Sequence, residues 1–209
     1  MNPRDSVMSP AAAGVSRRRA LALLGGLATL AGCHDAQPGF RSLDVSGAEW
    51  GRDFHLHDPE GHERSLAEFR GKVVLIFFGF TQCPDVCPTA LARAVEVRRA
   101  LGDDGRRLQV IFVTVDPERD TPAVLRAYLQ AFDADFLGLS GDLAQTEAAA
   151  RDFRIFYQKV PTGSSYTMDH TALSYAFDPA GRLRLAIRHA ETAASVAADV
   201  KLLLKERVM

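Results

Sequence analysis

The chain has 209 residues, of which 47% are hydrophobic and 24% charged, so it fits one domain with a tail and is not a disordered chain. The formal net charge is −1, but the first 33 residues hold four arginines and one acid, which leaves about −4 for the remainder. An acidic remainder without a basic patch argues against a nucleic-acid partner. Three cysteines are too few for a disulfide framework.

Residues 1–33 have the pattern of a lipoprotein export signal. Basic residues in Ser16–Arg19 precede the apolar run Ala20–Leu30, which is too short to span a bilayer core of ~30 Å. The run ends in Leu30-Ala31-Gly32-Cys33, which resembles the lipobox whose cysteine is lipidated in bacterial lipoproteins. We therefore expect a domain that is lipid-anchored at Cys33 on the periplasmic side of a bacterial membrane, exported by either the general or the twin-arginine route. The alternatives are an ordinary buried thiol and an uncleaved signal anchor.

Residues 34–48 mix Pro, Gly, Ser and polar residues, as expected of a linker, and residues 49–209 then form a single domain. The domain begins with Asp53–His57, which alternates in polarity, followed by the turn residues Asp58–Gly61. This pattern predicts an N-terminal β-hairpin.

The rest of the domain alternates between strand and helix patterns. Val73–Phe78 and Leu108–Val115 are continuous apolar runs, as expected of strands buried on both faces. Further elements are predicted from Gly, Pro and capping residues: a helical turn over 66–71, helices over 88–102, 121–132, 143–153 and 192–205, and a hairpin of strands 174–177 and 183–187. This order predicts an α/β fold with a central mixed sheet flanked by helices, in which the first two long strands are parallel neighbours.

Cys83 and Cys87 follow the first buried strand and open the helix predicted over 88–102. On a helix, thiols four residues apart have Cα atoms ~6 Å apart, within reach of one metal ion or of a disulfide. A helix amino terminus favours the thiolate, which is the form that binds metals and attacks disulfides. The alternative is two buried apolar cysteines that happen to be neighbours.

Four histidines also attract attention. His170 lies just before the strand predicted over 174–177, which can carry it to the same sheet edge as the cysteines, although a lone histidine is more often structural. His55 and His57 lie on one face of the predicted hairpin and could bind a metal as a pair, although exposed histidines are more common there. His34 follows Cys33 and is expected to belong to the linker.

Three segments resemble the signature motifs of the Sco/SenC family and occur in the family's order: Gly79–Pro88, Val115–Pro122 and Asp169–Thr171. The resemblance extends from about Phe54 to the C-terminus. It implies a thioredoxin-like fold and a copper-binding protein that helps assemble the binuclear copper centre in subunit II of cytochrome c oxidase.

Carried over position by position, Cys83, Cys87 and His170 match the copper ligands of the family, and Asp116 matches a nearby acidic residue implicated in how its members bind or react. Two thiolates and an imidazole are a soft donor set suited to Cu(I). Cu(II) could occupy the same ligands, and Zn(II) competes for cysteine and histidine. We also expect the charge of Asp116 to raise the pKa of the thiols.

Two functions use the same residues. A metallochaperone would hold copper on Cys83, Cys87 and His170 and pass it to subunit II or a similar acceptor, with a periplasmic copper donor and the membrane as further partners. A thiol–disulfide oxidoreductase would instead cycle Cys83 and Cys87 to keep the acceptor's cysteines reduced. His170 favours the first function, because disulfide exchange needs no distant imidazole. A peroxidase would fit this cysteine spacing poorly.

Overall fold

The computed structural model describes residues 39–206; the predicted export signal, Cys33 and His34 lie outside this range. The strands of the main sheet are β1 (Leu43–Asp44), β4 (Val73–Gly79), β5 (Leu108–Thr114), β6 (Leu137–Leu139), β9 (Ser174–Phe177) and β10 (Leu183–Ile187). Their order is β1-β10-β9-β4-β5-β6, with β4 parallel to β5 and antiparallel to β9. The predicted mixed sheet, with its two long strands as parallel neighbours, is therefore confirmed.

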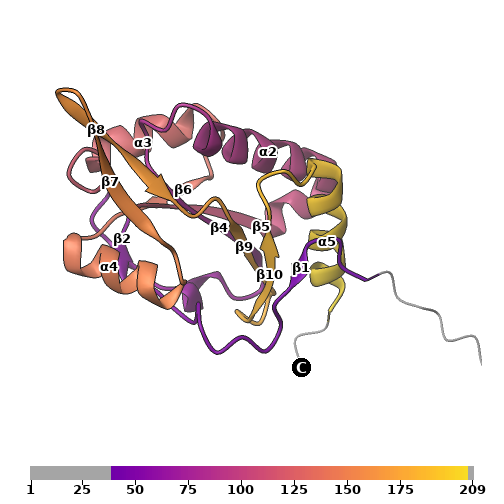
Figure 1. Ribbon diagram of the computed structural model, residues 1–209. Coiled ribbons are helices and arrows are strands. Elements are labelled where there is room, and N and C mark those ends of the chain that lie inside the picture. Colours follow the sequence, from indigo (N-terminus) through magenta and orange to yellow (C-terminus); the bar gives the residue numbers. More distant parts are fainter. Residues whose placement is uncertain (1–38, 207–209) are drawn as a thin grey trace, which may run out of the picture. The chain divides into compact units, whose positions relative to one another are not determined.

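Helices flank this sheet (Figure 1). They are α2 (Val86–Leu101), α3 (Pro122–Gln130), α4 (Leu143–Asp152) and α5 (Ala193–Lys205), with short 3₁₀ helices η2 (Leu66–Phe69) and η3 (Gly102–Arg107). Every residue of β4 is buried, because both faces of that strand are covered. Leu75 lines a hollow beneath α2, whereas the ring of Phe78 packs 5.1 Å from that of Phe153, which follows α4.

Capping residues in the sequence predicted where the helices begin and end. The Thr121 side chain accepts a hydrogen bond from the Val124 N–H, and Pro122 occupies the first turn of α3, as predicted. Helix α2 ends at Gly102, whose φ of 60° lies in the left-handed region that glycine tolerates. It begins at Val86, two residues before Pro88, so Val86 and Cys87 are also helical.

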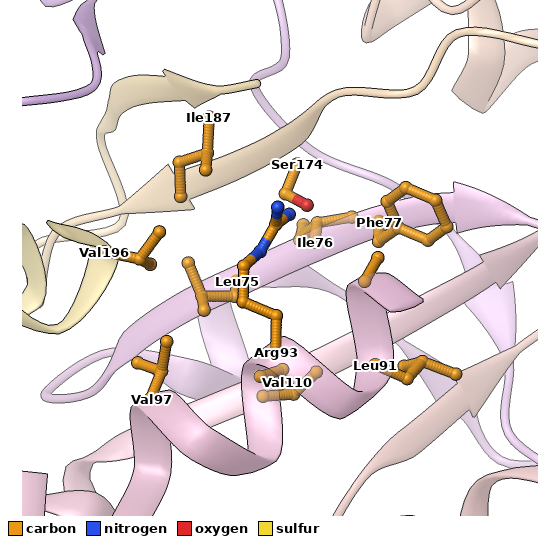
Figure 2. A pocket seen from close by; sticks show the side chains of 12 residues that line it. Leu75, Ile76, Phe77, Leu91, Arg93, Val97, Val110, Ser174, Ile187 and Val196 are labelled. Atoms are coloured by element: carbon orange, nitrogen blue, oxygen red, sulfur yellow. The ribbon is translucent and has the colours of Figure 1, made fainter. Parts of the chain in front are cut away.

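A small hollow of about 20 Å³ separates α2 from the sheet. Figure 2 shows the Arg93 guanidinium rising through it towards Ser174. Arg93 Nη1 donates to the carbonyl oxygens of Arg188 (3.3 Å) and Glu191 (3.2 Å), so this half-buried arginine connects the loop before α5 to α2. None of the predicted metal ligands lines this hollow.

Four regions differ from the sequence-based expectation. The prediction of a linker over 34–48 is wrong for Leu43–Asp44, because these residues form β1 and pair with β10. The N-terminal hairpin exists, but its strands, β2 (Leu56–His57) and β3 (Glu63–Arg64), are only two residues long. A second hairpin, β7 (Tyr157–Thr162) with β8 (Ser165–His170), was not predicted, and neither was β6.

Candidate metal centre

Three donor atoms converge beyond the carboxyl end of β4. The Sγ atoms of Cys83 and Cys87 and a ring nitrogen of His170 all lie within 4.8 Å of one another. Among residues 39–206, no other group of three or more histidine, cysteine or acidic side chains is arranged to hold a metal ion. Both cysteines are free thiols. The three residues chosen from the sequence are therefore brought together by the fold.

The cysteine loop joins β4 to α2. Cys83 lies before the helix, and its N–H donates to the Phe80 carbonyl at 3.3 Å, whereas Cys87 lies in the first turn. The Cys87 N–H donates to Cys83 Sγ at 3.4 Å, so the sulfur partners one of the N–H groups that a helix start leaves free. Of the two cysteines, only Cys87 lies within the helix, but its N–H at the helix amino terminus faces the Cys83 sulfur.

Gly79 makes room for the Cys87 sulfur. A Cβ atom built on Gly79 would lie 2.7 Å from Cys87 Sγ, 2.9 Å from the Phe77 ring and 3.0 Å from the Phe112 ring. Real carbon atoms do not approach sulfur or ring carbons so closely, so glycine is required at the last residue of β4 by close packing rather than by its backbone angles.

The second half of the site comes from β8, which ends at His170. His170 Nε2 lies 3.5 Å from Cys87 Sγ, and Nδ1 lies 3.1 Å from the Thr171 carbonyl oxygen. When Nδ1–H donates to that carbonyl, Nε2 keeps its lone pair directed at the sulfurs. The rings of Phe77 and Phe80 meet the imidazole edge-on, with centroids 5.9 and 5.8 Å away. The imidazole is thus oriented by a hydrogen bond and by two aromatic rings.

Burial acts in opposite directions on the pKa values of the two inner donor residues, His170 and Cys87. It lowers the pKa of His170, which keeps the imidazole neutral and able to bind a metal. It raises the pKa of the Cys87 thiol, which has 0% exposure, so a metal ion must displace a proton to bind there. Cys83 is half-buried and is the more accessible sulfur.

Asp116 occupies a different position from the one expected. Its carboxylate is held by the Arg119 guanidinium and by the Tyr166 hydroxyl at 2.8 Å. Burial raises the pKa of Cys87 most, the neighbouring Cys83 raises it further, and the carboxylate whose charge adds to this effect is that of Asp120. Asp120 is 1% exposed and accepts hydrogen bonds from the side chains of Thr81 (2.6 Å) and Thr114 (2.6 Å).

The other histidines do not join the site. His55 Nδ1 lies 3.0 Å from Glu63, and its side chain is 67% exposed. The backbone of His57 pairs with Ser140 across an isolated bridge. Neither histidine belongs to a group of three or more possible metal donors among residues 39–206.

Sequence reasoning missed the elements that position His170. The β7–β8 hairpin turns at Gly163, whose φ is +62°. The run Tyr166–His170 has inward residues at alternate positions, which is a strand signal. Asp120 lies within Val115–Pro122, one of the three segments that resemble the Sco/SenC motifs. Nothing in the sequence identified it as the buried hydrogen-bond partner of Thr81.

Comparison with known proteins identifies the family that has this fold and this group of donor residues. The fold is thioredoxin-like, with a Cys/Cys/His group at the end of its central strand. The family model described as SCO1/SenC matches residues 44–205, and the chain belongs to that family.

Individual relatives agree with this assignment. The mitochondrial SCO2 homologue of Mus musculus is 42% identical over 133 residues, which are 62% of this chain and 52% of that protein. The structure of Bradyrhizobium japonicum ScoI with copper bound is 45% identical, has a TM-score of 0.67, and covers 72% of this chain and 97% of that one. BsSco is described as having a disulfide switch and as a member of the Sco family of cytochrome c oxidase assembly proteins. Its structure is 22% identical, has a TM-score of 0.61, and covers 82% of this chain and all of that one. This likeness shows the shared fold. The chain spans about half to two thirds of the length of the first curated relatives, between 52% and 66%.

The packing at Gly79 yields a prediction. Gly79→Ala should destabilise the domain by about 1–3 kcal/mol, as overpacking does, and should displace the Cys87 sulfur from His170. Thermal unfolding measures the first effect, and Cu(I) binding measures the second. Gly39→Ala is the matched control, since a Cβ there meets nothing within 4 Å. Equal melting temperatures and equal metal binding for the two variants would contradict the close-packing argument.

The raised pKa of Cys87 yields a second prediction. Below the pKa of an unfolded thiol, both states are protonated and the thiol has no effect on stability. Above it, the unfolded chain ionises while Cys87 stays protonated in the fold, so stability should fall by up to about 1.4 kcal/mol per pH unit. Urea unfolding of the reduced, metal-free protein between about pH 7 and 10 measures this slope, because an unperturbed thiol titrates near 8.5. Cys87→Ser should remove the contribution; an unchanged slope in that variant would refute the assignment.

Proposed function

We propose that the protein is a copper metallochaperone, which binds Cu(I) through Cys83, Cys87 and His170. The observation that supports this most strongly is the convergence of these three donors within 4.8 Å of one another. Copper-bound ScoI, at 45% identity, lends support from a relative.

The donor set fits the chemistry of the ion. Two thiolates and one imidazole are soft ligands, and three donors close a trigonal site of the kind that Cu(I) accepts. A neutral, buried His170 needs no deprotonation before it binds. Cys83 supplies a sulfur near the surface, from which the ion can be exchanged with a partner, while Cys87 and His170 hold it from inside.

The recipient we propose is the binuclear copper centre in subunit II of cytochrome c oxidase. Membership of the SCO1/SenC family supports an oxidase-related partner, and BsSco is described as one of a family of oxidase assembly proteins. A periplasmic copper donor would complete the transfer. Both partners must reach Cys83, because Cys87 is fully covered.

Thiol–disulfide exchange is the second candidate function. The two sulfurs lie within 4.8 Å of each other, so a modest approach would bring them to bonding distance. The disulfide switch described for BsSco favours this possibility. In this function Cys83 and Cys87 would cycle between dithiol and disulfide to keep the recipient's cysteines reduced.

Metal binding is predicted as follows. In a full-length Cys33→Ser background, which leaves Cys83 and Cys87 as the only thiols, the reduced protein should bind about one Cu(I) per chain and prefer it to Zn(II). Cys83→Ser or Cys87→Ser should abolish tight binding, and His170→Ala should weaken it, because each removes one of three donors. Anaerobic competition with a colorimetric Cu(I) chelator measures the affinity. His55→Ala, which alters an exposed histidine outside the site, is the control; tight binding that survives either cysteine substitution would refute the site.

A cellular experiment separates the two functions. Cells that carry only the His170→Ala protein, grown at low copper, should lose oxidase activity if the protein delivers copper. They should assemble oxidase almost normally if the protein acts as a reductase, because the two sulfurs alone carry out the exchange. Reduction of a model disulfide by the purified variant shows whether the dithiol is intact.

We further propose that Cys33 is lipidated and anchors the domain on the periplasmic side of a bacterial membrane. The support is the Leu30–Cys33 lipobox after a short apolar run. Between residues 39 and 206, no helix combines the length and apolarity that crossing a bilayer requires. A multiply acylated terminus would hold such a domain stably at a membrane.

Cys33→Ser should therefore release the protein into the soluble fraction, whereas Cys83→Ser should leave it in the membrane fraction. Cell fractionation followed by an alkaline wash measures the distribution. A Cys33→Ser protein that remains in washed membranes would indicate an uncleaved signal anchor instead.

A further inference from the structure

The hairpin that carries His170 needs an external support. β7 and β8 pair only with each other in the described part of the chain, and Figure 1 shows them extending beyond the main sheet. A two-stranded hairpin is marginally stable alone in water. The distance between His170 and Cys87 therefore depends on side chains that connect the hairpin to the rest of the domain.

Arg119 makes this connection. Its Nη1 donates to the Tyr166 carbonyl oxygen on β8 at 2.7 Å and to Gln82 Oε1, next to Cys83, at 3.2 Å. Its Nε donates to Asp116 in the loop after β5. One guanidinium thus connects the His170 hairpin, the cysteine loop and the loop that follows β5.

Tyr166 strengthens the same contact. The Arg119 guanidinium carbon lies 3.7 Å from the centre of the Tyr166 ring, within range of a cation–π interaction. The Tyr166 hydroxyl donates to the second oxygen of Asp116 at 2.8 Å. Tyr166 and His170 lie four residues apart on β8, so they share the inward face of the strand. A residue that fixes Tyr166 therefore also fixes the direction in which His170 points.

Burial indicates that this contact is specific. The side chain of Arg119 is 17% exposed and that of Asp116 is 1% exposed. Arg119 Nη2 is buried without a hydrogen-bond partner, which costs stability. A flexible surface arginine would rotate so that this nitrogen contacts water. The stacking of the Arg119 guanidinium on the Tyr166 ring therefore outweighs the cost of the unpaired Nη2.

We propose that Arg119 is a positioning residue for the metal centre, which sets metal affinity by holding the His170 hairpin against the cysteine loop. The inference rests on the proposed function, since it takes Cu(I) as the ion and His170 as a ligand. Its effect should be felt through His170 and not through the sulfurs.

A double-mutant cycle tests this route. In the full-length Cys33→Ser background, Arg119→Gln should weaken Cu(I) binding about tenfold, the lower end of the loss typical for residues that orient metal ligands. In a His170→Ala background the same substitution should change the affinity less than twofold. The rate of Cys83 alkylation should stay the same in both backgrounds. Arg119→Lys should recover only part of the affinity, because an ammonium keeps the charge but lacks the planar fork.

Arg98→Gln is the matched control: Arg98 is 19% exposed and also pairs with carboxylates, those of Asp133 and Asp135, which lie outside the metal centre. It should leave Cu(I) affinity unchanged, and the melting temperatures of both variants show whether the fold is intact. An equal loss of affinity in the wild-type and His170→Ala backgrounds, or no loss in either, would overturn the inference. The His170→Ala variant alone reports on the proposed function: undiminished Cu(I) binding there would refute His170 as a ligand, whatever Arg119 does.

Discussion

The metal centre depends on a single close approach, that of Cys87 Sγ to His170 Nε2 at 3.5 Å. The two residues come from different layers of structure: one from the first turn of α2, the other from the end of a hairpin beside the sheet. The approach is possible because Gly79 leaves space beneath the sulfur and because Phe77 and Phe80 enclose the imidazole. The central strand therefore fixes both donors, through its last residues and the turn that follows.

Burial of Cys87 and His170 also determines which of them carries a proton. Enclosed thiols resist ionisation, whereas an enclosed imidazole resists protonation. The apo site thus holds a protonated Cys87 beside a neutral His170. Binding of a thiophilic ion exchanges the thiol proton for a metal bond and removes the cost of a buried charge, because the cation neutralises the thiolate. A buried site of this kind disfavours an isolated thiolate and favours a metal-bound one.

Sequence reasoning succeeded where the signals are local. β4 and β5 are long apolar runs buried on both faces, and the start of α3 is determined by Thr121 and Pro122, so these elements and their parallel order could be predicted. The three donor residues that converge in the fold were also singled out from the sequence, but His170 was identified by its resemblance to a family motif and not by its neighbours. The β7–β8 hairpin and β6 were missed because their strands are short or exposed; β6 has three residues, and its Gly138 is required by the close approach of Leu125. Asp116 was assigned to the thiols, whereas its actual partners, Arg119 and Tyr166, come together only in three dimensions.

Accessibility connects the two functions that the site supports. Cys87 is fully buried, whereas Cys83 is half-buried and forms the outer edge of the donor group. A partner that takes copper by ligand exchange must first bind the ion from the Cys83 side, and a partner disulfide must be attacked by the sulfur that it can reach. Both reactions therefore begin at Cys83. They differ in what happens inside the site, because only metal transfer requires an imidazole to hold the ion while Cys83 is released. Disulfide exchange needs only the two sulfurs, whereas the proposed metal site also needs His170 and the hairpin that carries it. The convergence of His170 on the pair of thiols therefore supports a site built around a metal.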